Sequence, residues 1–288
     1  MKIKKTIEKV MNSLFLACGM VAVLSVIGIT VYMVVCGIPA IKEIGIKDFL
    51  FGRVWKSTAK EPEYGILPFI LTSVYGTAGA VIIGVPVGVF TAIFLAKIAD
   101  KRLAGIVRPA VELLSGIPSV VYGLIGMIVL VPAIMKCFHL KNGTCLLAAV
   151  VVLAVMILPS IVSLSETALM AVPKEYEEAS MALGATEMET IFKVTVPAAK
   201  SGIATGIVLG IGRAIGEAMA VMMVAGNVPN MPGLFNSVTF LTTAISKEMS
   251  YATGFQRDAL YSIGLVLFIF IMVINIVLNV FLKGGDEK

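Results

Sequence analysis

The sequence predicts an all-α polytopic membrane protein with six transmembrane helices, and three observations support this fold class. Of the 288 residues, 58% are hydrophobic and only 14% are charged, whereas an ordinary globular domain carries roughly 25% charged residues. The mean hydropathy is +0.99. Finally, six apolar runs are long enough to cross a hydrocarbon layer of ~30 Å, which takes about 20 helical residues.

The six predicted spans are distributed along the whole chain. The first follows the basic start Met1-Lys-Ile-Lys-Lys, which resembles a signal sequence. Its apolar run is too long for one, so we expect a retained first helix. The second span exceeds the length that a perpendicular crossing needs, which predicts tilt or an extension beyond the bilayer. The approximate boundaries are 13–36, 66–97, 110–135, 145–170, 201–226 and 259–282.

Basic residues predict the orientation of the chain. Four lysines precede the first span, and cytoplasmic loops carry the excess of Lys and Arg, so we place both termini in the cytoplasm. We divide the chain into a first helix with an extracytoplasmic segment, 1–65, and a core of five spans, 66–283. The amino-terminal lysines are Lys2, Lys4, Lys5 and Lys9.

Composition disfavours several other functions. The net charge of +5 fits cytoplasmic loops, and no interleaving of aromatic and basic residues suggests nucleic-acid binding. The four cysteines have no C-x-x-C spacing and His139 is the only histidine, so we expect no metal site. For Cys137 and Cys145 we favour two unpaired thiols over a disulfide.

The longest cytoplasmic connection, 173–196, predicts a helix, a sharp turn and a second helix. Pro173 suits the first helical position, and Gly184 suits a left-handed cap that ends the first helix. Thr186 and Glu189 have the T-x-x-E spacing of a capping box that starts the second helix.

Within this connection, EASMALGATEMETIFKVTVP (178–197) resembles the EAA motif of ABC-importer permeases. Ser180 replaces the second alanine of that motif. The resemblance implies a type I (MetI-like) permease fold and a coupling helix that docks on a separate ATPase. Its residues here are Glu178, Ala179, Ser180, Gly184 and Pro197.

The chain contains no G-x-x-x-x-G-K-[ST] sequence, so it supplies no P-loop of its own. We therefore expect a transport subunit rather than an enzyme, which itself binds no cofactor. ATP and Mg would be used by the partner ATPase.

Three further stretches resemble the PstC-type permeases of phosphate importers: 64–77, 115–123 and 212–227. The resemblance implies a heterodimer with a PstA-type permease, two PstB-type ATPase subunits and an extracytoplasmic PstS-type phosphate-binding protein. Ala218 stands where the family often has threonine.

Two charges lie inside the fifth predicted span, in GRAIGEAMAV (212–221). At about 100° per residue, Arg213 and Glu217 fall beside a strip of glycines. A charge near the bilayer centre costs at least roughly 2.5–3.5 kcal/mol and normally faces a bundle interior or an aqueous path. The glycine strip is Gly202, Gly206 and Gly210, and its candidate packing partner on the second span is the row Gly76, Ala80, Gly84 and Gly88.

We hypothesise that Arg213 orients phosphate on the translocation path, because its guanidinium presents a planar fork of donors. Glu217 would hold Arg213 or an arginine of the partner permease. A structural ion pair without substrate contact is the alternative for both residues.

Two rival functions stay open. The same architecture would suit another oxyanion, such as phosphonate or sulfate. An ion-coupled secondary transporter would also use an intramembrane Arg/Glu pair, but it predicts inverted repeats and gives the 178–197 motif no role. We disfavour an intramembrane enzyme because no acid–base pair other than Arg213 and Glu217 falls within a predicted span.

Overall fold

Helices dominate the structure, a computed structural model that describes the backbone of residues 2–283 and the side chains of residues 8–277. Within these residues, five helical segments are long and apolar enough to cross a membrane, and a sixth results if one bent pair is counted as a span. The predicted all-α polytopic class is therefore confirmed. The five segments are Glu8–Ile44, Leu67–Ile98, Ser119–Phe138, Leu146–Met170 and Gly254–Val277, and the bent pair is Glu187–Ala198 with Lys200–Gly216.

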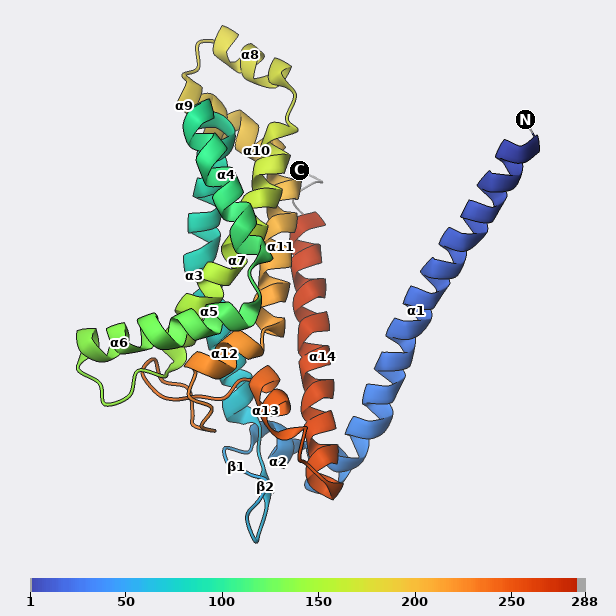
Figure 1. The fold of residues 1–288 in the computed structure, drawn as a ribbon, viewed down its shortest axis with the longest axis vertical. Coiled ribbons are helices and arrows are strands. Elements are labelled where there is room, and N and C mark those ends of the chain that lie inside the picture. The colour runs from blue at the N-terminus through green and yellow to red at the C-terminus, as the bar shows by residue number, and fades with distance from the viewer. Residues whose placement is uncertain (1, 284–288) are drawn as a thin grey trace.

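Six long helices form the body of the molecule (Figure 1). Shorter helices, three π-turns and one two-stranded antiparallel sheet connect them. The long helices are α1 (Lys2–Ile44), α3 (Leu67–Ile93), α4 (Lys101–Gly116), α7 (Leu146–Met170), α11 (Lys200–Gly216) and α14 (Gly254–Lys283). The short helices are α2 (Ile46–Phe51), α5 (Ser119–Ile125), α6 (Val131–Phe138), α8 (Lys174–Ala182), α9 (Glu187–Thr190), α10 (Val196–Ala198), α12 (Met219–Val224) and α13 (Leu241–Glu248). The π-turns are η1 (Phe94–Ile98), η2 (Gly126–Leu130) and η3 (Ile191–Thr195), and the strands are β1 (Trp55–Lys56) and β2 (Glu63–Tyr64), with Trp55 opposite Tyr64.

Helix α7 is the centre of the bundle. Small residues on its neighbours let their backbones approach it closely, as in other membrane helix pairs. A Cβ atom added to Gly84 or Gly88 of α3 would lie 2.7 Å from Ile157 or 2.8 Å from Ile161 of α7. A Cβ on Gly210 of α11 would lie 3.0 Å from the same Ile161. The prediction that the two glycine rows pack on each other is therefore wrong, because α7 lies between them.

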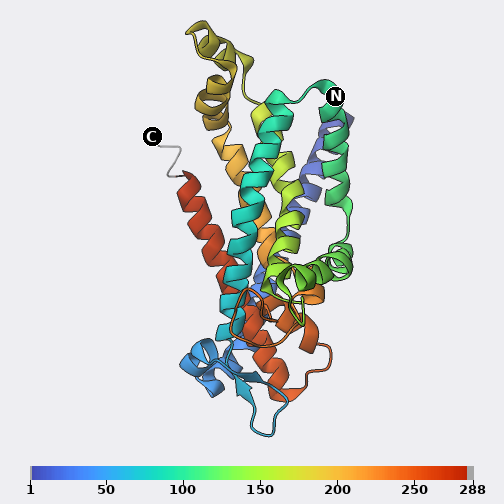
Figure 2. The same ribbon diagram turned by 90° about the vertical axis from the view of Figure 1, so that its left-hand side faces the viewer.

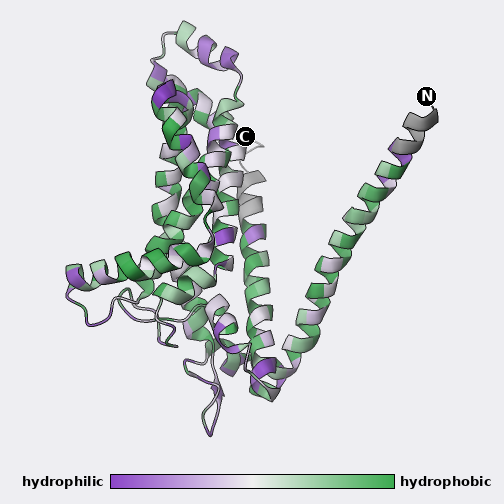
Figure 3. Cartoon of the chain, viewed as in Figure 1, coloured by the Kyte–Doolittle hydropathy of each residue, from purple (hydrophilic) through white to green (hydrophobic). Residues whose placement is uncertain are grey.

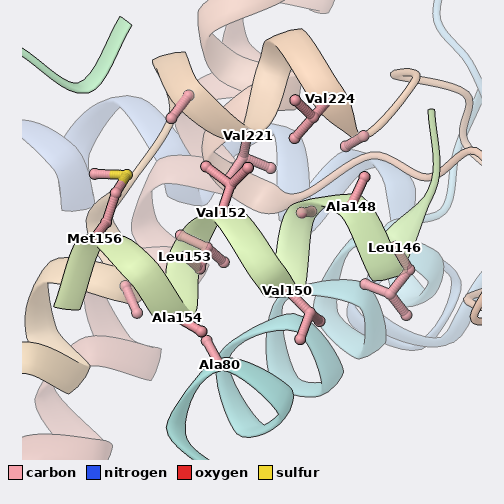
Figure 4. Close-up of a cluster of buried hydrophobic side chains, with 14 of the residues drawn as sticks. Ala80, Leu146, Ala148, Val150, Val152, Leu153, Ala154, Met156, Val221 and Val224 are labelled. Carbon is pink, nitrogen blue, oxygen red and sulfur yellow. The ribbon is translucent and has the colours of Figure 1, made fainter. Parts of the chain in front are cut away.

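The same arrangement is visible in the largest buried cluster (Figure 4). Val150 and Ala154 of α7 point toward Ala80 of α3, while Val152 lies under Val221 of α12. All of these side chains are buried. The sequence of α7 is a nearly continuous apolar run because other helices pack against it on several sides.

The predicted third span, 110–135, is not one straight helix. Helix α4 ends at Gly116, and Ile117 and Pro118 adopt extended backbone conformations before α5 begins. Proline disfavours helix at the preceding residue and lacks an N–H donor, so the break falls at Pro118. Helices α5 and α6 then run across the bundle rather than along it (Figures 1 and 2).

The predicted fifth span, 201–226, is also broken. Helix α11 ends at Gly216, and Glu217 has an extended backbone with φ −72° and ψ 128°. Helix α12 follows as a separate short helix. At its other end, α11 meets the preceding helix Glu187–Ala198 at an angle of 69°.

Helix α1 extends well beyond the predicted first span and leans away from the bundle (Figure 1). It touches α14 only toward its carboxyl end, where Ser262 donates a hydrogen bond of 2.6 Å to the carbonyl of Gly37. Most of the described part of this helix is coloured as hydrophobic in Figure 3, and its large hydrophobic side chains between Val10 and Val31 are largely exposed within this chain. Such a surface suits lipid or another apolar partner.

The segment after α1 forms a small folded cap at the end of the bundle opposite to α8. It consists of α2 and the β1–β2 hairpin. The carboxylate of Glu248, on α13, ties it down by accepting hydrogen bonds from the Trp55 indole at 3.1 Å and the Ser57 hydroxyl at 2.8 Å. Cys137 and Cys145 are free thiols, the state that we favoured over a disulfide. Cys145 is fully buried.

Candidate functional site

Arg213 lies in the last turn of α11 and is half-buried. Within residues 8–277 no ion pair joins it to Glu217. The next residue, Ala214, is buried in the same apolar cluster as Tyr122 of α5, and the Tyr122 hydroxyl donates a hydrogen bond of 2.6 Å to the Leu114 carbonyl. The turn of α11 that carries Arg213 is therefore anchored in this cluster.

Glu217 does not continue the helix that carries Arg213, so the prediction that both lie on one helical strip is wrong. Its carboxylate accepts a hydrogen bond of 2.9 Å from the Ala220 N–H, and so caps the start of α12. Its carbonyl accepts one of 2.8 Å from the Thr242 hydroxyl. The break after Gly216 leaves the first N–H groups of α12 without helical partners, and Glu217 satisfies one of them.

A partly buried ion pair that sequence reasoning missed lies between α4 and α7. The Arg108 Nε donates to Glu166 Oε1, and its Nη2 donates to the Leu95 carbonyl at 3.3 Å. Glu166 is only 9% exposed. Arg108 lies just outside the predicted third span, so this pair joins an arginine near the end of a loop to a carboxylate inside the predicted fourth span. The signal was present in the sequence, because Glu166 is the one acidic residue of the predicted fourth span.

Residues 173–199 form a helical hairpin, here called the α8–α10 hairpin, which projects from one end of the bundle (Figure 1). Gly184 ends α8 with φ +91°, a conformation that side chains disfavour. Thr186 and Glu189 form the predicted capping box at the start of α9. The structure thus has the helix, turn and helix that this sequence predicts.

The motif residues take two different positions on this hairpin. Glu178 and Ala179 are exposed on α8, and Pro197 is exposed on α10. The Ser180 hydroxyl instead faces inward and shares a hydrogen bond of 2.9 Å with the Thr190 hydroxyl. Glu178 and Ala179 are therefore free for a partner, while Ser180 holds the hairpin together.

Large apolar side chains accompany the exposed motif residues. Leu183, at the tip of the hairpin, is 91% exposed. Exposed apolar side chains that gather in one place mark interaction sites. The group is Tyr176, Met181, Leu183, Met188 and Phe192.

Glu177, next to the motif, points the other way. Its Oε1 accepts from Lys97 Nζ at 2.5 Å and from the Thr195 hydroxyl at 3.0 Å. Lys97 belongs to η1, which continues α3. Glu177 therefore connects the α8–α10 hairpin to a spanning helix, a contact that the sequence motif does not indicate.

A cavity of about 580 Å³ lies under the β1–β2 hairpin, far along the chain from Arg213. Three carboxylates and one arginine line it: Glu43, Asp48, Glu63 and Arg53. This excess of negative charge disfavours an oxyanion. Among the described residues, no group of three or more His, Cys, Asp or Glu side chains could hold a metal ion.

Residues 84–285 match the family described as binding-protein-dependent transport system inner membrane component. The chain belongs to this family, and is therefore a multi-pass inner-membrane permease subunit of a binding-protein-dependent ABC importer. It is a transport subunit rather than an enzyme, and it works with an ATPase and a binding protein. This membership also removes the secondary transporter as a rival.

Curated relatives cover most of the chain. The "Probable ABC transporter permease protein YqgH" of Bacillus subtilis strain 168 is 42% identical over 268 residues, which cover 90% of this chain and 87% of that protein. The "Phosphate transport system permease protein PstC" of Pasteurella multocida strain Pm70 is 34% identical over 263 residues, with coverage of 84% and 81%. The predicted similarity to PstC-type permeases is therefore confirmed.

Two solved structures share the fold. An inward-facing structure of the MetNI methionine ABC transporter has a TM-score of 0.58 and 23% identity, and covers 77% of this chain and 94% of that chain. A bacterial alginate ABC transporter, in complex with a pentasaccharide-bound periplasmic protein, has a TM-score of 0.62 and 16% identity, with coverage of 96% and 94%. The predicted MetI-like permease fold is confirmed.

Proposed function

We propose that this chain is the PstC-type subunit of an importer for inorganic phosphate. Its similarity to PstC proteins over more than four-fifths of its length carries the proposal. The relative named YqgH is more similar, and its name gives no substrate. Another oxyanion, such as phosphonate or sulfate, is therefore the second candidate.

In this proposal, Arg213 attracts phosphate on the path through the membrane. It is half-buried in the last turn of α11, and Glu217, the acid nearest to it in the sequence, is occupied in capping α12. Because none of the ion pairs among residues 8–277 involves Arg213, its donors and its charge stay available for an anion. Glu217 acts indirectly, because it fixes the break that ends α11 one turn beyond Arg213.

The α8–α10 hairpin provides the contact with the ATPase subunits. Its outward surface combines the exposed motif residues Glu178 and Ala179 with the apolar tip at Leu183. A desolvated apolar centre with polar neighbours is the composition of a typical protein interface. ATP and Mg are bound by those subunits and none by this chain.

This assignment also orients the chain. ATP is supplied in the cytoplasm, so the hairpin lies on the cytoplasmic side. The amino-terminal end of α1 and the carboxyl-terminal end of α14 lie at the same end of the molecule as α8 (Figure 1). In this proposal both termini are cytoplasmic, in agreement with the prediction from the basic residues.

The remaining partners follow from the PstC assignment. A homologous PstA-type permease completes a heterodimer, two PstB-type subunits hydrolyse ATP, and an extracytoplasmic PstS-type protein delivers phosphate. Exposed apolar helix faces, such as that of α1, provide surface for the second permease.

The test is uptake of labelled phosphate by the complete complex in proteoliposomes, with unlabelled phosphate, sulfate and phosphonate as competitors. We expect competition by phosphate only. Displacement by sulfate or phosphonate at equal concentration would reassign the cargo.

The role of Arg213 is tested in the same assay with Arg213→Lys and Arg213→Gln. Lysine keeps the charge but lacks the planar fork, so we expect a partial loss with lysine and a larger loss with glutamine. Two assembled variants with wild-type uptake would contradict a substrate role for Arg213.

A further inference from the structure

The carboxylate of Glu177 joins three separate elements. It belongs to α8, it receives a hydrogen bond from Lys97 of η1, and it receives another from Thr195 of η3. The Lys97 and Glu177 side chains are only 14% and 22% exposed, and Thr195 is fully buried. Charge-assisted hydrogen bonds are roughly twice as strong as neutral ones, and partial burial protects them from screening by salt.

This contact links parts of the chain that have no direct covalent connection. The α8–α10 hairpin is continuous with α7 at one end and with α11 at the other. Helix α3 approaches it only through space, at η1. Ile191 of η3 and Ile93 of α3 also belong to one buried apolar cluster. For α8 itself, Glu177 is the polar link to α3.

Adjacent residues of α8 point in opposite directions. Glu178 and Ala179 are exposed on the outer surface, while Glu177 turns inward to Lys97. A force on the outer surface of α8 would therefore reach α3 through the neighbouring side chain. Helix α3 in turn packs closely on α7 at Gly84 and Gly88, so that movement of its end is transmitted along the bundle.

Both partners of Glu177 lie in π-turns, η1 and η3. A π-turn replaces the i→i+4 hydrogen-bond pattern over one turn and is frequent at functional sites. Sharp kinks in helices occur at such π-bulges. The ion pair spans the point at which both of them meet α8.

We propose that Glu177 is a positioning residue for transport, which with Lys97 transmits the movement of α8 to α3. The proposal rests on the ABC-importer function of the chain and goes beyond its sequence motif, which does not include either residue. Loss of the pair leaves ATP hydrolysis in place and uncouples it from substrate movement.

The experiment uses the complete complex in proteoliposomes and measures the ratio of anion imported to ATP hydrolysed. Coupling free energies between sites correspond to factors of about 5 to 150. We expect Glu177→Gln and Lys97→Gln each to lower the ratio at least about fivefold while ATP hydrolysis persists. Lys97→Arg and the charge-swapped variant Lys97→Glu/Glu177→Lys should restore it.

Lys193→Gln is the matched control. It removes the exposed pair with Glu189, whose atoms are 3.2 Å apart, from the same hairpin, and should leave the ratio unchanged. A purely structural role of Glu177 predicts that uptake and ATP hydrolysis fall together with the amount of complex, at a constant ratio. That outcome, or wild-type ratios in both glutamine variants, would overturn the proposal.

Two further outcomes are informative. If the glutamine variants fail to assemble, the charge-swapped complex decides: a wild-type ratio supports the proposal and a reduced ratio overturns it. If the wild-type complex imports a different oxyanion, the phosphate assignment fails, and the ratios are compared for that anion instead. The two failures are therefore distinguishable.

Discussion

Replacing Ile161 by alanine should destabilise the bundle at the α7 interface. Ile161 is fully buried in α7 and lies against both glycine rows. Its Cγ2 would be 2.8 Å from a Cβ on Gly88 of α3, and its Cγ1 would be 3.0 Å from a Cβ on Gly210 of α11. The isoleucine therefore fills the space that two glycines leave open.

The expected loss is about 2 kcal/mol. In water-soluble cores, truncation of a buried isoleucine to alanine costs about 2–5 kcal/mol, which combines lost transfer free energy with the cavity left behind. Between membrane helices the transfer term is small, because lipid is as apolar as the core. Packing contacts and the cavity remain, which places the cost at the low end of that range.

The assay is the free energy of unfolding of the purified chain in detergent–lipid micelles, from denaturant titration at constant slope. Ile82→Ala is the matched control, since Ile82 lies on the neighbouring α3 and is 73% exposed. It should change stability by less than about 0.5 kcal/mol. Equal losses in the two variants would refute the central position assigned to α7.

Three other perturbations follow from single contacts. Gly184→Val forces φ +91° on a branched residue at a cost of about 1–3 kcal/mol, so less ATPase subunit should copurify with the permease; full retention would show that the turn does not matter. Arg108→Met leaves the buried Glu166 carboxylate unpaired and should cost about 1–3 kcal/mol of unfolding free energy, whereas adding Glu166→Leu should recover much of it; a double variant as unstable as the single one would contradict this. Burial is the larger cause and the negative charge of Glu248 the smaller cause that raise the pKa of Tyr64. The folding stability that this tyrosine contributes is therefore fully present below its ordinary pKa of about 10, and it is lost as the pH rises through the higher pKa of the folded state. Absorbance titration against Tyr64→Phe measures that value, and Glu248→Gln should lower it; an unchanged midpoint would remove Glu248 as a cause.

The sequence alone determined the class and the family resemblance of this protein, because both depend on local patterns. Apolar runs of bilayer length predicted the polytopic fold, and the 145–170 run became α7 within one residue. The turn at Gly184 and the capping box of Thr186 were predictable for the same reason. A positive φ and a cap are properties of a few consecutive residues.

Only the tertiary structure decided where the spans break and which charges meet. Pro118 lies in an apolar run that hydropathy joins into one helix, although the chain changes direction there. Arg213 and Glu217 have the spacing of a helical pair, yet the carboxylate caps α12 instead. The pairs of Glu166 with Arg108 and of Glu177 with Lys97 join residues 58 and 80 positions apart, and no local pattern encodes a contact of that separation. Composition and spacing indicate which secondary structures a segment can form. The packing of the helices, with α7 between two glycine rows, determines which polar groups face each other.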